Sequence, residues 1–314
     1  MSTILRANGK LLLTGEYFIL DGALALAMPT LKYGQTLQTA TQNLPHLRWT
    51  ALDTTLGNTP TAQTWLDLSF DNNGAYTLHT GDVAIADTLQ RLLQTVAQLT
   101  DKQVFTPQFI TTTVNYPRAW GLGSSSTLVS LVAQWAGVDA YRLNAIAFGS
   151  SGYDIACATA EQPILYQNNG THSATPRTVQ PINFAPTFAE NLYLVYLGNK
   201  QNSREGIAHY RKLSATKIAQ SVPIITQLTQ QIAQSNDLAT FESLLHTHEN
   251  YLAEALQISR AQTLHFSDYW GVIKSLGAWG GDFVLATSNR SQADTMVYFG
   301  RKGFKTVVAW CDFF

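Results

Sequence analysis

The sequence predicts an α+β fold, because segments typical of strands and turns fill it to about residue 80 and helices then alternate with strands. In the first part Asn72-Asn73-Gly74 is a typical hairpin tip between apolar runs. Residues 87–99 are the first with clear helical periodicity. Later segments repeat the mixture, with strands predicted at 193–197, 283–287 and 306–310 and helices at 214–234 and 238–256.

Length and composition fit a two-domain protein. The chain has 314 residues, of which 45% are hydrophobic, enough for a sizeable core. Residues 167–177 are polar and contain Asn168-Asn169-Gly170 and Pro176, which makes them the best candidate for a linker or crossover. We therefore expect an N-terminal domain of residues 1–172 and a C-terminal domain of residues 173–314.

The charge of the chain limits its possible partners. Lys and Arg number 20 and Asp and Glu 21, a net charge of −1, so no basic excess exists for nucleic acid. No apolar run is long enough to cross a membrane, and the first residues lack the pattern of a signal peptide. We expect a cytoplasmic monomer or homodimer whose partner is a small-molecule substrate, with Cys157 and Cys311 as reduced, buried thiols.

The segment from Pro117 to Ser126, PRAWGLGSSS, is the most informative feature of the chain. It follows the β-branched run 109–114 and precedes apolar residues at helical spacing, so it is expected to be a loop that opens a helix. Gly121 and Gly123 let backbone N–H groups approach a ligand closely, and the helix N-terminus adds about half a positive charge. The loop therefore favours a triphosphate.

Two other interpretations of this loop remain open at the sequence level. A dinucleotide-binding turn also links a strand to a helix, and Asp139 lies at about the expected distance for a ribose-binding acid, although Ser126 replaces the third glycine. A helix capped by serine after a glycine turn would need no ligand at all. A Walker A loop is excluded, since the sequence has no GxxxxGK[ST].

Two further segments place charge or glycine beside apolar strands. Near the start, an apolar run lies between Lys10 and Glu16, each flanked by glycine. Near the end, KSLGAWGGDF at residues 274–283 is a second glycine-rich turn that leads into a strand. In a chain with only 13% charged residues, against about 25% in typical proteins, ionic groups at both ends of an apolar run point to a site.

The three segments, in this order, resemble the GHMP kinase superfamily, which includes galactokinases, homoserine kinases, mevalonate kinases and phosphomevalonate kinases. NGKLLLTGEY is similar to the family's first motif, PxxxGLGSSS to its phosphate loop and KSLGAWGG to its third motif. SGYD at 151–154 resembles the segment with the catalytic aspartate, and GYDIA at 152–156 resembles a bacterial GHMP subgroup. The likeness is greatest to the mevalonate and phosphomevalonate branch.

The resemblance implies a ribosomal-S5-like N-terminal domain, a ferredoxin-like C-terminal domain and an active site in the cleft between them. It implies an ATP-dependent kinase that uses Mg²⁺, with Lys10 and Asp154 as catalytic residues and Ser125 as a metal ligand. The ATP-binding residues would be Pro117, Gly121, Leu122, Gly123, Ser124, Ser125 and Ser126. The substrate-binding residues would be Glu16, Ser203, Gly277, Ala278, Trp279, Gly280 and Gly281.

The chain departs from the family pattern at three positions. Asn8 replaces a proline, and Trp279 replaces a glycine, so its indole is expected to pack on substrate or adenine. Leu143 stands where mevalonate kinases carry a metal-binding glutamate, so the magnesium would rest on Ser125, phosphates and water, or on another acid such as Glu16.

The residues themselves allow phosphoryl transfer, which needs an aligned acceptor oxygen and a neutralised triphosphate more than covalent help from the protein. Lys10 would stabilise charge, and Asp154 would take the acceptor proton, unless the acceptor is already a phosphate and Asp154 only positions groups. Asp154 could instead cap a short helix at 155–160. The expected acceptor is mevalonate or phosphomevalonate. The alternatives are a sugar or homoserine-type kinase, a diphosphomevalonate decarboxylase-like enzyme, and a non-catalytic nucleotide-binding regulator.

Overall fold

The computed structural model describes residues 3–41, 45–54, 61–170, 175–198, 203–277, 279 and 282–314. Contacts divide the chain into two compact units. The first unit consists of Met1–Lys10, Thr30–Arg118 and Leu122–Thr159, and the second of Leu11–Pro29, Ala119–Gly121 and Ala160–Phe314. The division of the chain after residue 172 stays a prediction.

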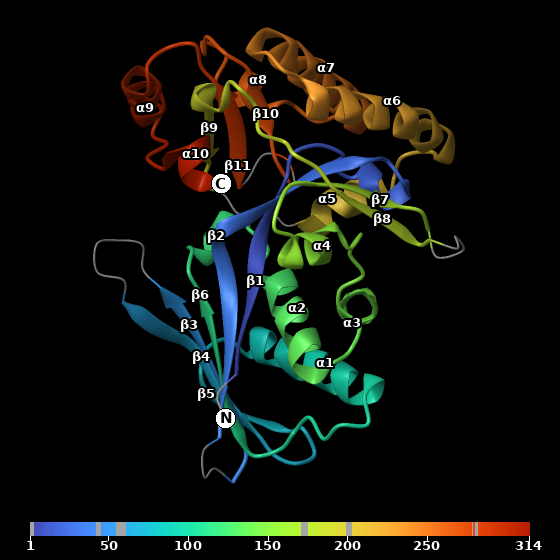
Figure 1. Cartoon of the computed structure of the whole chain (residues 1–314), viewed down its shortest axis with the longest axis vertical. Helices are drawn as coiled ribbons and strands as arrows, with labels where there is room; N and C mark the ends of the chain where they lie inside the picture. Colours follow the sequence, from blue (N-terminus) through green and yellow to red (C-terminus); the bar gives the residue numbers. More distant parts are fainter. Residues whose placement is uncertain are drawn as a thin grey trace. The chain divides into compact units, whose positions relative to one another are not determined.

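The first unit contains a sheet with the strand order β5-β4-β3-β6-β2, and β1 also pairs with β2 (Figure 1). Neighbouring strands on this path are antiparallel except β3 and β6, which are parallel. The strands are β1 (Thr3–Leu12), β2 (Ala25–Ala40), β3 (Leu47–Thr54), β4 (Ala62–Phe70), β5 (Tyr76–Thr80) and β6 (Gln108–Val114), of which β1 and β2 also contribute residues to the second unit.

Helices of the first unit pack on one face of this sheet. They are α1 (Val83–Leu99), α2 (Ser124–Ala136), α3 (Ala140–Ala147) and α4 (Tyr153–Thr159), with the short 3-10 turn η2 (Arg118–Trp120) before α2. The α1 helix starts four residues earlier than its periodicity predicts, because the Asp82 side chain accepts a hydrogen bond from the Ile85 N–H and caps it.

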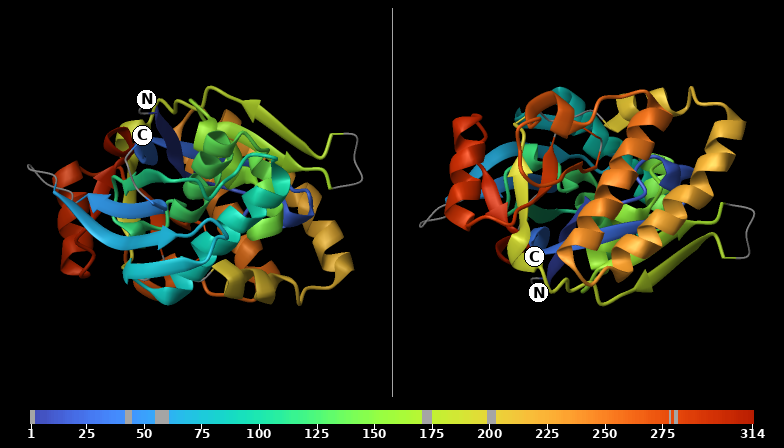
Figure 2. Two further views of the ribbon diagram at one scale, coloured as in Figure 1. Left: turned by 90° about the horizontal axis from the view of Figure 1, so that it is seen from below. Right: turned by 90° about the horizontal axis from the view of Figure 1, so that it is seen from above.

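The second unit contains a four-stranded antiparallel sheet with the order β10-β11-β9-β12. Its long helices α6 and α7 lie side by side, as Figure 2 shows in orange. The strands of this sheet are β9 (Leu192–Tyr196), β10 (Ile273–Ser275), β11 (Phe283–Thr287) and β12 (Val307–Ala309). Two further strands, β7 (Ile164–Asn168) and β8 (Arg177–Pro181), continue the larger sheet in the order β2-β7-β8. The helices are η1 (Phe18–Asp21), η3 (Ala189–Asn191), α5 (Ser203–Tyr210), α6 (Ala215–Gln234), α7 (Leu238–Leu256), α8 (Ala261–His265), α9 (Gln292–Arg301) and α10 (Trp310–Phe313).

The described residues at both ends of the polar stretch 167–177 pair with each other as a β-hairpin. Gln167 pairs with Thr178 and Asn168 with Arg177 in the antiparallel ladder of β7 and β8. The expectation of a linker there is wrong, because turn residues such as Asn and Gly mark a hairpin tip as well as a linker.

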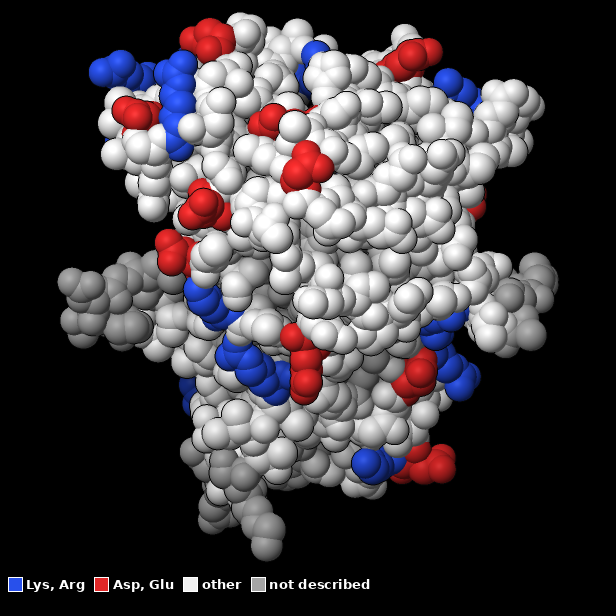
Figure 3. Space-filling view, turned by 45° about the horizontal axis from the view of Figure 1, so that its top comes forward, with Lys and Arg blue, Asp and Glu red and all other residues white. Residues whose placement is uncertain are grey.

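The surface carries few charges, as the composition predicts. On the face in Figure 3 the basic and acidic side chains are scattered among a majority of uncharged ones, and its described residues form no extended basic patch. Within the described part of the chain, no helix is long and apolar enough to span a membrane. Both cysteines are free thiols; Cys157 is buried as expected, but Cys311 is exposed.

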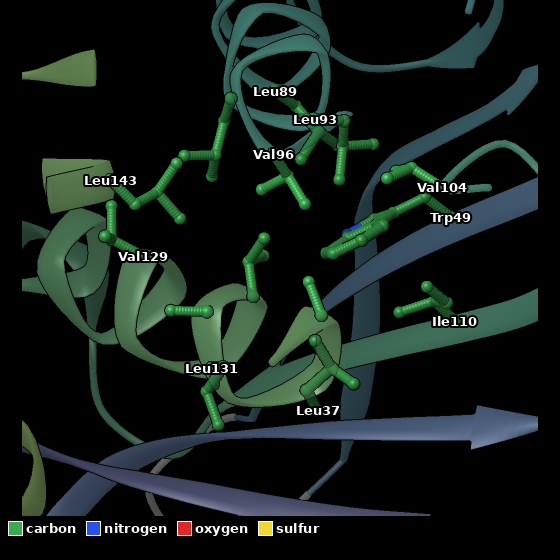
Figure 4. Packing of buried hydrophobic residues seen from close by; sticks show 14 of the residues in the cluster. Leu37, Trp49, Leu89, Leu93, Val96, Val104, Ile110, Val129, Leu131 and Leu143 are labelled. Carbon is green, nitrogen blue, oxygen red and sulfur yellow. The ribbon is translucent and has the colours of Figure 1, made fainter. Parts of the chain in front are cut away.

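The core of the first unit lies between the sheet and its helices (Figure 4). Trp49 from β3 and Ile110 from β6 point toward Leu93 and Val96 of α1, and all four are at most 1% exposed. Alternation along β3 explains this, since Arg48 between the buried Leu47 and Trp49 is exposed. The predicted α+β class is confirmed, with one sheet packed on helices in the first unit and a second sheet in the other.

Candidate active site

The phosphate loop predicted from sequence lies between β6 and α2. Gly121 and Gly123 have φ angles of 68° and 89°, in the region that favours glycine. Gly123 is the N-cap of α2, and no side chain caps the helix. Since glycine has no side chain to accept from the first N–H groups of this 13-residue helix, its N-terminus has the arrangement that suits an anionic ligand.

The serines of this loop differ in orientation. Ser126 is buried and its hydroxyl donates to the Gly123 carbonyl at 2.9 Å, whereas Ser125 is exposed. The Thr127 hydroxyl donates to Gln35 Oε1 at 2.7 Å and ties α2 to β2. Ser125 therefore has the exposed hydroxyl that a ligand or a cation can reach. Of the remaining residues predicted here, Leu122 is fully buried, and Pro117 and Ser124 are half-buried.

The alternative interpretations of the loop do not fit. Asp139 caps α3, where its side chain accepts from the Arg142 N–H, and the sheet beside α2 is mostly antiparallel rather than doubly wound. The serine-capped helix is also wrong, since the N-cap is Gly123.

Lys10 lies against this loop within the first unit. Its N–H donates to the Leu122 carbonyl at 2.9 Å, which joins β1 to the loop. A Cβ built on Gly123 would lie 3.1 Å from Lys10 Cγ, so the lysine side chain runs directly over that glycine. Its Nζ lies 5.9 Å from the centre of the Tyr153 ring, at the start of α4.

Asp154 occupies the first turn of α4 and does not precede the helix as an N-cap. Its Oδ1 accepts hydrogen bonds from the Ser150 hydroxyl at 3.2 Å and the Ile155 N–H at 3.1 Å. Burial raises its pKa above the usual value, while the positive charge of Lys10 acts to lower it. An aspartate with raised proton affinity beside a lysine is suited to take a proton from a hydroxyl group.

Gly121 belongs to the second unit, where it lies close to Asp282. A Cβ built on it would lie 2.1 Å from Asp282 Oδ2, so only glycine fits there. The neighbouring Trp120 packs between Phe283 at 5.5 Å and Phe313 at 6.3 Å, measured between ring centres. The aromatic contacts hold the beginning of the loop.

The described residues offer limited support for a metal ion. No three His, Cys, Asp or Glu side chains among them form a group that could hold one. Leu143 is fully buried in the core of the first unit, so nothing at that position replaces the glutamate of mevalonate kinases. Ser125 fits a magnesium ion that keeps most of its contacts to phosphate and water.

Glu16 lies in a buried ionic cluster of the second unit. Its Oε1 accepts a very short hydrogen bond from Lys274 Nζ, and both side chains are fully buried. The family resemblance had assigned Glu16 to the substrate or to magnesium, but its carboxylate pairs with Lys274. Lys274 and Glu249 were not predicted as functional residues. For Lys274 the available signal was a charged residue directly after the apolar Val272 and Ile273.

Trp279, in the third glycine-rich motif, is buried in the core of the second unit. Its φ is 51°, in the region that glycine prefers, and its side chain is 6% exposed. The indole packs with Phe18, Tyr210 and Leu252 in the core of the second unit, where its N–H has no hydrogen-bond partner among the described residues. Gly277 has a φ of 62°. Ala278, Gly280 and Gly281 lie outside the described residues, and Ser203 is the first residue of α5.

Solved structures of known proteins share the fold over nearly the whole chain. Phosphomevalonate kinase of Streptococcus pneumoniae, in complex with phosphomevalonate and AMPPNP, is 17% identical, with a TM-score of 0.66 and coverage of 98% of this chain and 99% of that one. Galactokinase of Lactococcus lactis, in complex with galactose, is 13% identical, with a TM-score of 0.68 and coverage of 98% and 92%. A mevalonate diphosphate decarboxylase from Legionella pneumophila is 12% identical, with a TM-score of 0.59 and coverage of 98% and 100%.

The chain has the fold of the GHMP kinase superfamily, as the sequence predicted. No protein-family model matches the sequence, and no curated protein matches it either. Kinases and a decarboxylase share this fold, so the reaction has to be argued from the residues.

Proposed function

We propose that this protein is an ATP-dependent small-molecule kinase that transfers the γ-phosphoryl group to an alcohol or phosphate acceptor. The observation that carries the proposal is the grouping of Lys10, Asp154 and the uncapped N-terminus of α2 within one unit. These groups match the needs of phosphoryl transfer, which are charge stabilisation, a proton acceptor and a phosphate cradle.

In this proposal the backbone N–H groups of residues 121–126 bind the β- and γ-phosphates of ATP. Lys10 stabilises the negative charge on the transferring group. Asp154 takes the proton of an acceptor hydroxyl group, helped by the raised pKa that burial gives its carboxyl. If the acceptor is a phosphate, Asp154 acts only to position Lys10 and the acceptor.

Magnesium, held by Ser125 together with phosphate and water, would neutralise triphosphate charge. The protein supplies one hydroxyl ligand, and the exposed position of Ser125 allows it.

Mevalonate or phosphomevalonate is the proposed acceptor class, which would place the enzyme in isoprenoid precursor synthesis. The support is the motif resemblance, with Glu16, Ser203 and the turn at 277–281 assigned to the acceptor side. A sugar or homoserine-type alcohol is the alternative acceptor, and loss of carbon dioxide after phosphorylation is the alternative reaction.

A panel of acceptors tests the proposal. ADP release from Mg·ATP would be measured with mevalonate, phosphomevalonate, mevalonate diphosphate, homoserine and galactose, and product masses would show an added phosphoryl group or lost carbon dioxide. We expect one acceptor to give strong turnover with an added phosphoryl group. ATP binding with no turnover on any acceptor would instead favour a regulator on the same fold.

A further inference from the structure

A buried ionic cluster joins three segments of the second unit. Lys274 Nζ contacts Glu16 Oε1, Glu249 Oε1 at 3.4 Å and the Ser275 carbonyl at 2.9 Å. The Ser275 hydroxyl donates to Glu249 Oε2 at 3.1 Å, and His248 Nε2 lies 3.6 Å from Glu16 Oε2. None of these ionisable side chains is more than 1% exposed.

The cluster fixes the turn that follows β1. Glu16 belongs to that turn, Glu249 to α7 and Lys274 to β10, so one ammonium group links all three segments. Burial and the charge of Lys274 lower the pKa of His248, which leaves its imidazole neutral. Lys274 is therefore the cation that compensates the two carboxylates.

Tyr17, which follows Glu16 in the chain, has an unusual backbone conformation, with φ 63° and ψ −50°. Such a conformation persists only where surrounding contacts maintain it. The Glu16 side chain anchors one side of Tyr17. On the other side the Phe18 N–H donates to the Glu16 carbonyl at 2.7 Å, and the Phe18 side chain is fully buried.

The conformation of Tyr17 directs its side chain onto α5. Its ring stacks on Tyr210 with 6.1 Å between centres. A Cβ built on Gly206 would lie 2.3 Å from the Tyr17 hydroxyl oxygen. Alanine is the better helix former, so a glycine inside α5 is explained by the space that Tyr17 occupies.

The end of α5 has separate anchors. The Tyr210 hydroxyl donates to Asp21 Oδ2 at 2.6 Å, and His209 Nε2 lies 2.6 Å from the Leu256 carbonyl. Among the described residues, Tyr17 thus links the β1 turn to Gly206 in the first half of the helix.

We propose that Glu16 and Lys274 are positioning residues that act through Tyr17 to hold α5 in place for the acceptor. This inference rests on the proposed function, which assigns Ser203, the first residue of α5, to the acceptor side. In this arrangement Glu16 does not touch the acceptor and affects its binding only by holding α5 in place, in agreement with the complete burial of Glu16.

Gly206→Ala is the first test, with Gly300→Ala as its control. Both glycines are helical, but a Cβ on Gly300 would meet nothing within 4 Å. Gly206→Ala should speed amide hydrogen exchange in residues 203–210 and raise KM for the acceptor about tenfold, with KM for ATP unchanged. Gly300→Ala should change neither, and adding Tyr17→Phe to Gly206→Ala should restore part of both.

The second test concerns the ionic cluster itself. Lys274→Met would leave buried carboxylates without a cation and is expected to fold poorly, so Glu16→Gln is used, with the exposed Glu254→Gln on α7 as control. Glu16→Gln should also speed exchange in residues 203–210, and Glu254→Gln should not.

Wild-type exchange and unchanged KM in both Gly206→Ala and Glu16→Gln would overturn the proposal. Wild-type hydrogen exchange in Glu16→Gln alone would overturn the proposal that the ionic cluster holds α5 in place. Hydrogen exchange needs no activity, so a wild-type protein that transfers no phosphoryl group would contradict the proposed function without affecting this readout.

Discussion

At the scale of single residues, the two carboxylates identified from the sequence, Glu16 and Asp154, both have shifted proton affinities. Glu16 and Asp154 have raised pKa values because each is removed from water, and a lysine opposes the shift in each case. The lysine partner of Asp154 is Lys10, and that of Glu16 is Lys274. The sequence could not predict that Glu16 pairs with Lys274, because the two residues are 258 positions apart in the chain.

Folding stability should depend on pH through Glu16. Burial raises its pKa from 4.5 to about 7, so between these pH values the folded state holds a proton that the unfolded state has lost, whereas above about pH 7 Glu16 is ionised in both states. Its stabilising contribution is therefore full below pH 4.5 and is lost as the pH rises through about 7. We expect urea unfolding of the wild type to show this decline and Glu16→Gln to lack it. A matching decline in Glu16→Gln would contradict the assignment, and Glu254→Gln serves as the surface control.

Catalysis should depend on pH through Asp154. Its carboxyl must be ionised to accept a proton, so kcat should decrease on the acid side, at a pH above the ordinary aspartate value of 3.8. The Ser150 hydroxyl lowers this pKa by donating to the carboxylate, so Ser150→Ala should move the acid limb of the kcat profile to higher pH. An acid limb that stays in place in Ser150→Ala would argue against Asp154 as the base.

At the scale of helices and strands, local patterns predicted most elements. The α7 helix and the β11 strand have the bounds that periodicity and composition indicate, 238–256 and 283–287. Strand pairing was harder to predict from sequence. The polar residues between β7 and β8 have the composition of a linker, and only the pairing of the two strands identifies a hairpin. The same holds for the candidate site. The glycine loop could be located from sequence because it is a local motif, but the contacts of Glu16 and Trp279 involve segments that are distant in the chain.

The conformation of the phosphate loop gives a further prediction. Gly123→Ala would place a Cβ 2.8 Å from Ser126 Oγ and 3.1 Å from Lys10 Cγ, at a φ of 89°. Gly303→Ala is the matched control, with a φ of 92° and nothing within 4 Å. Each should lose about 1–2 kcal/mol of stability from the left-handed backbone. Only Gly123→Ala should weaken ATP binding, by about tenfold or more, in calorimetric titration. Equal ATP affinity in the two variants would remove the loop from the nucleotide site.

At the scale of the whole molecule, the fold is shared with enzymes that act on different substrates. The fold alone therefore does not identify the reaction or the substrate, which depend on the side chains of the site.

We propose that Lys10 and Asp154 carry phosphoryl transfer beside the α2 N-terminus. The most direct test measures single-turnover transfer from Mg·ATP, with the acceptor found in the panel, for the wild type, Lys10→Met and Asp154→Asn, alongside ATP binding by calorimetry. With an alcohol acceptor, each variant should lose about 10²–10⁴-fold in rate while still binding ATP. Transfer at the wild-type rate in both variants, with ATP bound, would contradict the catalytic assignment.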